Sequence, residues 1–115
     1  MNGKDCVSQG KTALGIEFGS TRIKGVLIDY EGNVLATGTY DWENSLVNGI
    51  WTYGLDEVVK GLQGCYAALK KDVQAKYDIT PTTFGAIGIS AMMHGYITFD
   101  GEGNQLAPFR TWRNT

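Results

Sequence analysis

The stretch that decides the fold is residues 13–29, which read ALGIEFGSTRIKGVLID. Two apolar runs flank a Gly-Ser-Thr corner, and this pattern predicts two strands, Ala13–Phe18 and Ile23–Asp29, joined by a tight antiparallel turn. A plain hairpin needs only a good turn, whereas this one has a carboxylate before the corner and two cations after it. This concentration of charge at one turn indicates a binding role in addition to a structural one.

The segments that follow predict the rest of a sheet and one helix. A third strand is expected over Val34–Tyr40, after the turn DYEGN, whose Gly and Asn favour a second hairpin. From residue 55 to residue 77, apolar side chains recur every three or four positions, which predicts one amphipathic helix. Phe84–Ser90 is small and apolar, as a buried parallel strand would be, and Tyr96–Phe99 begins a further strand.

Three more expectations concern the ends and faces of this fold. Residues 1–11 are polar and lack periodicity, so they are predicted to form a flexible leader before a folded part over 12–115. Residues 41–54 contain turn formers and two tryptophans without a clean period, which predicts a surface loop. The first two strands are apolar on both faces in places, so we expect the sheet to be covered on both sides.

One short pattern occurs twice. IDYEGNVLA at 28–36 and FDGEGNQLA at 99–107 share an Asp, a Glu-Gly-Asn run and a Leu-Ala pair at matching positions. Either two hairpins use the same turn chemistry, or the chain contains a true repeat. Because nothing else around the two segments matches, shared turn chemistry is the favoured interpretation.

Composition limits the kinds of partner. The 115 residues are 43% hydrophobic and 19% charged, which is typical of one folded domain. A net charge of −2 provides no basic surface for a nucleic-acid backbone or an anionic membrane. No apolar run approaches the roughly 20 residues of a membrane span, and the first residues lack the apolar core of a signal peptide, so a cytoplasmic location is expected. Cys6 and Cys65 lack metal-ligand spacing and are interpreted as free thiols.

The charged corner suits phosphate chemistry. Gly19, Ser20 and Thr21 can turn backbone N–H groups and hydroxyls toward one point, a concavity that accepts phosphate oxygens. Glu17 can hold a hydrated Mg²⁺, and Lys24, like the Arg at position 22, can meet anionic oxygens. The alternative is a plain edge hairpin in which the acid and the base pair across the turn. The turn residues by themselves leave both interpretations open.

Two longer segments carry a family resemblance. GIEFGSTRIKGVLID and GISAMMHGYITFDGEGNQLAPFRTWRN resemble the phosphate-contacting hairpin and the sugar-binding segment of the FGGY carbohydrate kinases, most nearly the xylulose kinase branch. The resemblance spans residues 13–115. It implies an α/β fold of the ribonuclease H-like type, with the mixed sheet shared by actin and hexokinase, of which this chain is the N-terminal part of the first domain.

The resemblance assigns the hairpin to the phosphates. Glu17 matches the position at which the family usually has an Asp that engages Mg²⁺ and the phosphates. Gly19, Ser20 and Thr21 match the small phosphate-facing corner, and Lys24 matches the basic position after it. Glu17 is one methylene longer than the usual Asp, which alters the geometry available to a metal.

The resemblance assigns four later residues to the sugar. Met93 and His94 match a Met-His-Gly segment that lines the sugar site, and Trp112 matches a Trp that closes the pocket. Asn114 stands where an Asp is usual, so an amide that can also donate replaces a carboxylate. A lone His after an apolar strand is otherwise often structural; the flanking match favours contact with sugar hydroxyls.

What the resemblance implies is an ATP-dependent kinase that uses Mg²⁺ and transfers the γ-phosphoryl group to a hydroxyl of a ketose or polyol, with pentuloses such as xylulose favoured. The family's general base, an Asp, and its adenosine pocket are expected beyond Thr115. We therefore expect the 115 residues alone to be an inactive fragment, marginally stable or self-associating as a homo-oligomer. Two alternatives stay open: an actin-like ATPase that binds no sugar, and a noncatalytic binding module.

Overall fold

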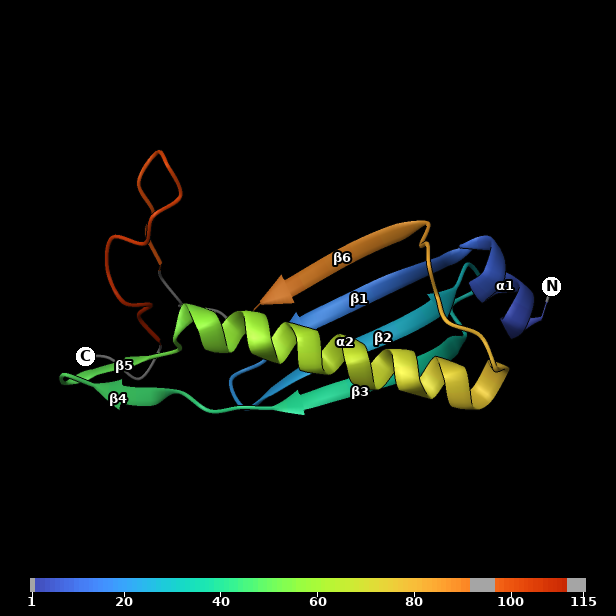
Figure 1. Cartoon of the computed structure of the whole chain (residues 1–115), viewed down its shortest axis with the longest axis horizontal. Helices are drawn as coiled ribbons and strands as arrows, with labels where there is room; N and C mark the ends of the chain where they lie inside the picture. The colour runs from blue at the N-terminus through green and yellow to red at the C-terminus, as the bar shows by residue number, and fades with distance from the viewer. Residues whose placement is uncertain (1, 92–96, 112–115) are drawn as a thin grey trace.

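The computed structural model describes residues 2–91 and 97–111, which form an α/β fold (Figure 1). The elements follow in the order α1 (Gly3–Gln9), β1 (Thr12–Phe18), β2 (Arg22–Asp29), β3 (Val34–Asp41), β4 (Ser45–Val47), β5 (Ile50–Thr52), α2 (Leu55–Tyr77) and β6 (Ala86–Ala91). The predicted helix over 55–77 is confirmed, and the first four predicted strands are confirmed within two residues at each end. The fourth of these strands, β6, is parallel as predicted, but it is exposed along its length and not buried, because α2 does not reach over it.

The main sheet is mixed, in the strand order β3-β2-β1-β6. The two hairpins make β1–β2 and β2–β3 antiparallel, whereas β6 joins β1 in parallel after the chain has crossed over through α2. A parallel strand needs such a long connection, which explains why the helix lies between β3 and β6 in the sequence. β6 therefore ends at Ala91 beside Phe18, at the end of the sheet where β1 turns into β2.

The core lies between the sheet and α2, which covers one face of β2 and β3 (Figure 1). Ile23 and Leu27 of β2 meet Leu69 and Val73 of α2, and all four side chains are fully buried. The close approach depends on Gly38 of β3: a Cβ there would lie 2.3 Å from the backbone nitrogen of Leu69. The apolar pattern thus determines which side of α2 is buried, and Gly38 allows the helix backbone to lie close to β3.

The opposite face of the sheet is not covered, so the expectation of cover on both sides is wrong for the described residues. Alternate residues of β1 and β2, including Glu17 and Lys24, are exposed there. On the α2 side, the helix stops short of β6, whose Ile87 and Ile89 are 60% and 68% exposed. The radius of gyration is 16.5 Å, larger than the about 13 Å of a compact domain of this size.

The exposed apolar edge predicts self-association of the 115-residue chain. β6 is an uncharged edge strand, and such strands template pairing between chains. We expect sedimentation to show association that grows with protein concentration, and Ile89→Lys to weaken it about tenfold or more because a charge would be buried in the contact. Val34→Lys, on the other edge strand and 60% exposed, is the matched control. A sharp, high melting temperature independent of concentration would contradict this expectation.

Two sequence predictions are wrong because tertiary contacts override a weak local pattern. Residues 1–11 contain the helix α1, which is capped by Asn2 accepting from the Asp5 N–H at 2.8 Å and ended by Gly10 at φ 70°. Cys6 and Val7 are buried against the core, so this segment is folded and not a flexible leader. With only two adjacent apolar residues, it shows no helical period in the sequence.

The predicted loop over 41–54 is also wrong. It contains the two-stranded hairpin β4–β5. This small sheet lies beyond the end of β3, and β5 leads directly into α2 (Figure 1). The predicted strand over Tyr96–Phe99 is not found in the described residues of that range, where Phe99 forms a single bridge with Gln105.

The two echoed segments form the same turn. In the first, Asp29 accepts from the backbone N–H groups of Glu31 and Asn33, and the Asn33 side chain donates to its second oxygen. Asp100 makes the same three bonds in the second. Gly32 and Gly103 have φ values of 87° and 88°, which only glycine adopts freely. The interpretation of shared turn chemistry is confirmed locally.

Asp72 on α2 ties the helix to the edge strand β3. Its carboxylate accepts from the Thr37 N–H at 2.9 Å and from the Lys76 ammonium at 3.1 Å. The Thr37 hydrogen bond, aided by Lys76, holds the pKa of Asp72 below its ordinary 3.8 despite the opposing effect of burial. Because the folded-state pKa is lower, this stabilisation is present above about pH 3.8 and is lost as pH falls through the folded-state pKa.

We therefore expect Asp72→Asn to lower the free energy of unfolding at pH 7 by about 1 kcal/mol, with the difference from wild type vanishing in acid. Lys76→Gln, which keeps the Thr37 bond, should cost only about 0.3–0.5 kcal/mol. Urea titrations at a series of pH values from 7 down to 2 measure both effects. An Asp72→Asn deficit of equal size at every pH would contradict this assignment.

Candidate phosphate site

The turn between β1 and β2 is built around Gly19. The Gly19 N–H donates to the Arg22 carbonyl at 2.9 Å, which closes the turn. A Cβ on Gly19 would lie 2.8 Å from that same oxygen, so this position requires glycine. Ser20 and Thr21 form the tip. These three residues are called the 19–21 turn.

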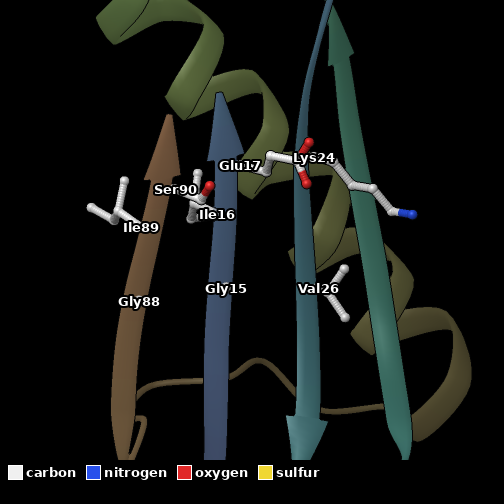
Figure 2. A pocket seen from close by; sticks show the side chains of 8 residues that line it. All are labelled: Gly15, Ile16, Glu17, Lys24, Val26, Gly88, Ile89 and Ser90. Atoms are coloured by element: carbon white, nitrogen blue, oxygen red, sulfur yellow. The ribbon is translucent and has the colours of Figure 1, made fainter. Parts of the chain in front are cut away.

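Glu17 and Lys24 stand directly opposite each other in the β1–β2 register. Both lie on the open face, the side of the sheet that faces away from α2, beside a shallow hollow of about 470 Å³. Figure 2 shows the Glu17 carboxylate reaching toward β2, while the Lys24 amino group extends away from it over β3. In the part of the chain that the structure describes, no ion pair joins the two, which disfavours the alternative of a merely paired hairpin.

The residues next to Glu17 on the open face are small. Ser90 of β6 is its partner in the parallel β1–β6 register, and Gly15 and Gly88 line the hollow below them (Figure 2). Glycines leave the backbone accessible, so a large polyanion can approach this surface closely. The acid, the hydroxyl and the turn thus stand at one end of the same face.

Arg22 forms an ion pair with Asp41. Its Nε donates to the Asp41 carboxylate at 2.9 Å across β2 and β3. Both side chains are largely exposed, at 60% and 78%, so the pair is weak. Arg22 therefore has a weak acidic partner in Asp41, whereas Lys24, on the same side of β2, makes no ion pair among the described residues.

Two aromatic residues that the sequence interpretation left in a loop hold the 19–21 turn from behind. Trp42 donates from its indole Nε1 to the Gly19 carbonyl at 2.8 Å and from its backbone N–H to the Thr21 carbonyl at 3.1 Å. Tyr53 donates its hydroxyl to the Ser20 carbonyl. The β2–β3 register pairs Arg22 with Asp41 and so brings Trp42 beside the turn, a placement that no local pattern in the sequence indicates.

A metal at this site would have Glu17 as its protein carboxylate. The described residues contain no group of three or more His, Cys, Asp or Glu side chains able to hold an ion by themselves. Mg²⁺ is commonly bound by one or two carboxylates, with water and substrate phosphates completing its shell. A single exposed carboxylate close to the 19–21 turn fits that mode, and the residues present are compatible with Mg²⁺ carried by a nucleotide.

The predicted sugar residues Met93, His94, Trp112 and Asn114 lie outside the described residues. Their neighbours show where the segments begin: Ala91 pairs with Phe18, beside the 19–21 turn, and the Thr111 N–H donates to the Trp51 carbonyl at 3.3 Å. No helix in the described ranges is long and apolar enough to cross a membrane.

The mixed sheet, its crossover helix and the turn at the end of β1 define the class: this is the actin- and hexokinase-like fold in its sugar kinase form. The N-terminal domain of the FGGY family of carbohydrate kinases matches residues 12–115. The chain therefore belongs to the FGGY family. A search of curated proteins found no match.

Solved structures share this fold. The xyloylose kinase of Brucella ovis is 24% identical with a TM-score of 0.75, and the match covers 90% of this chain and 21% of that one. The gluconate kinase of Lactobacillus acidophilus is 22% identical (TM-score 0.68, 88% and 19% covered), and the glycerol kinase of Plasmodium falciparum, solved with ADP, is 19% identical (0.65, 90% and 21%). The chain spans about one fifth of the length of these kinases.

Proposed function

We propose that this chain is part of an ATP-dependent carbohydrate kinase that transfers the γ-phosphoryl group to a hydroxyl of a ketose or polyol, with a pentulose such as xylulose favoured. The observation that carries the proposal is the pairing of Glu17 and Lys24 on the open face, close to the 19–21 turn, within a chain that belongs to the FGGY family. The likeness to a xyloylose kinase and the segment around Met93 and His94 support a ketose substrate.

In this reaction the chain mainly positions and neutralises charge. The 19–21 turn would receive phosphate oxygens on its backbone N–H groups, and Lys24 would offset negative charge on the same face. Glu17 would hold Mg²⁺, and the ion when bound supplies neutralisation of the charge that develops on the phosphates. His94 and Met93 would contact the sugar, with Trp112 and Asn114 closing its pocket.

The proton acceptor for the sugar hydroxyl is proposed to lie outside these residues. The family resemblance places a general base, an Asp, beyond Thr115, together with the adenosine pocket. We therefore propose that the 115 residues do not phosphorylate sugar by themselves. We also propose that the active protein is cytoplasmic. Measurable turnover by the purified 115-residue chain would overturn this part.

The test is a substrate panel on the full-length gene product that carries these residues. ADP release from MgATP is measured with D-xylulose, D-ribulose, glycerol or gluconate, and mass spectrometry identifies a phosphorylated sugar. We expect sugar-dependent ADP release, fastest with a pentulose. ADP release that ignores every sugar would instead favour the actin-like ATPase, and no nucleotide binding in a calorimetric titration would favour the noncatalytic module.

A further inference from the structure

The three carbonyls of the 19–21 turn all accept hydrogen bonds from two residues of one neighbouring segment. Trp42 supplies two donors, to the carbonyls of Gly19 and Thr21, and Tyr53 supplies one, to that of Ser20. Carbonyls in exposed turns are ordinarily satisfied by water. Here protein donors hold the carbonyls of all three turn residues.

This arrangement determines where the turn's own donors point. The peptide bond is planar, and every one in the described ranges is trans, so each N–H points opposite to the carbonyl of the same peptide unit. The Gly19 carbonyl faces Trp42, so the Ser20 N–H faces away from it. The Ser20 carbonyl faces Tyr53, so the Thr21 N–H likewise faces away. The two donors that a phosphate would use are thereby held in fixed directions.

The donors themselves are rigidly packed. The rings of Trp42 and Tyr53 lie 4.2 Å apart, and they are flanked by Phe18 at 6.2 Å from Trp42 and Phe109 at 5.8 Å from Tyr53. Tyr53 is only 3% exposed. Apolar rings such as phenylalanine would be enough to fill the space that these aromatic residues occupy. Packing alone therefore does not explain why the Trp42 indole N–H and the Tyr53 hydroxyl are directed at the turn.

We infer that Trp42 and Tyr53 are positioning residues that hold the Ser20 and Thr21 N–H groups in the direction required for phosphate binding. The inference rests on the proposed function for the identity of the ligand, a nucleotide phosphate, and on the hydrogen bonds above for the residues. Neither side chain lines the hollow on the open face. Their effect would pass entirely through the backbone of the 19–21 turn.

The experiment compares Tyr53→Phe and Trp42→Phe with Tyr77→Phe in the full-length gene product. Tyr77 is the matched control, because its half-buried hydroxyl also donates to a backbone carbonyl, that of Leu35, at 3.2 Å, but far from the turn. Calorimetry measures the Kd for MgADP, kinetics with D-xylulose gives kcat and KM for ATP, and NMR relaxation gives the order parameters of the turn amides. All three variants should lose comparable thermal stability.

We expect Tyr53→Phe and Trp42→Phe to weaken MgADP binding about tenfold and to lower kcat/KM for ATP about 10- to 100-fold, with the KM for D-xylulose unchanged. The order parameters of Ser20 and Thr21 should fall from about 0.85 toward 0.6. Tyr77→Phe should change neither binding nor these order parameters. If the two variants resemble Tyr77→Phe in both readouts, the inference is overturned.

Failure of the proposed function would look different. If wild type binds MgADP but phosphorylates no sugar, the kinase assignment fails while the binding and relaxation readouts still decide the inference. If wild type binds no MgADP, the inference is overturned together with the nucleotide site, even if the order parameters change. A loss of kcat/KM for ATP without any change in the turn amides would also overturn it, because the effect would not pass through the turn.

Discussion

Gly38→Ala is expected to lower the free energy of unfolding of the 115-residue chain by about 3 kcal/mol or more. The added methyl would lie 2.3 Å from the backbone nitrogen of Leu69 and 2.5 Å from the Cys65 carbonyl oxygen, distances that no side-chain rotation can relieve. The helix α2 would have to move away from β3. That movement would open the layer in which Leu69 and Val73 are buried, so packing would be lost beyond the point of contact.

The measurement is urea unfolding at protein concentrations at which wild type sediments as a monomer. Gly88→Ala is the matched control: it is also a strand glycine, but nothing lies within 4 Å of the position of its Cβ. We expect the control to be neutral or slightly stabilising, since alanine lowers the entropy of the unfolded chain. Equal stability of Gly38→Ala and Gly88→Ala would show that the helix does not sit as close to the strand as described.

The second large effect is on activity. Glu17→Gln in the full-length gene product should lower kcat/KM for ATP by about 10²- to 10³-fold, because the amide keeps the shape of the side chain but removes the charge that would hold Mg²⁺. The residue is exposed and, among the described residues, makes no ion pair, so the substitution should leave the melting temperature within about 1 °C of wild type. Steady-state kinetics across Mg²⁺ concentrations measures the loss.

Two further variants sharpen this prediction. Glu17→Asp restores the carboxylate at a shorter reach, so it should recover much of the activity and shift the dependence on Mg²⁺. Glu31→Gln removes a similar exposed charge at the opposite end of the sheet, in the turn after β2, and should have no effect. If Glu17→Gln and Glu31→Gln behave alike in an active kinase, the carboxylate at position 17 does not serve the metal.

Much of the fold could be predicted because its elements carry strong local patterns. The apolar stripe in α2 repeats over about six turns, and the two hairpin turns contain the residues that tight corners require. Both features can therefore be recognised from the local sequence, without knowledge of tertiary contacts. α1 and β4–β5 were missed for the opposite reason. α1 has only two buried side chains, Cys6 and Val7, and the strands β4 and β5 have three residues each, too few for any period.

For the site, the sequence by itself determined the chemistry: an acid at 17, a small corner at 19–21 and a cation at 24, because residue types and short spacings survive without a fold. Tertiary structure alone decided their use. It paired Arg22 with Asp41, placed Glu17 and Lys24 on one open face, and brought Trp42 and Tyr53 into hydrogen bonds with the turn carbonyls. Such partners come from strand register and side-chain packing, which join residues 19 to 33 positions apart, and no local pattern encodes which donor meets which carbonyl.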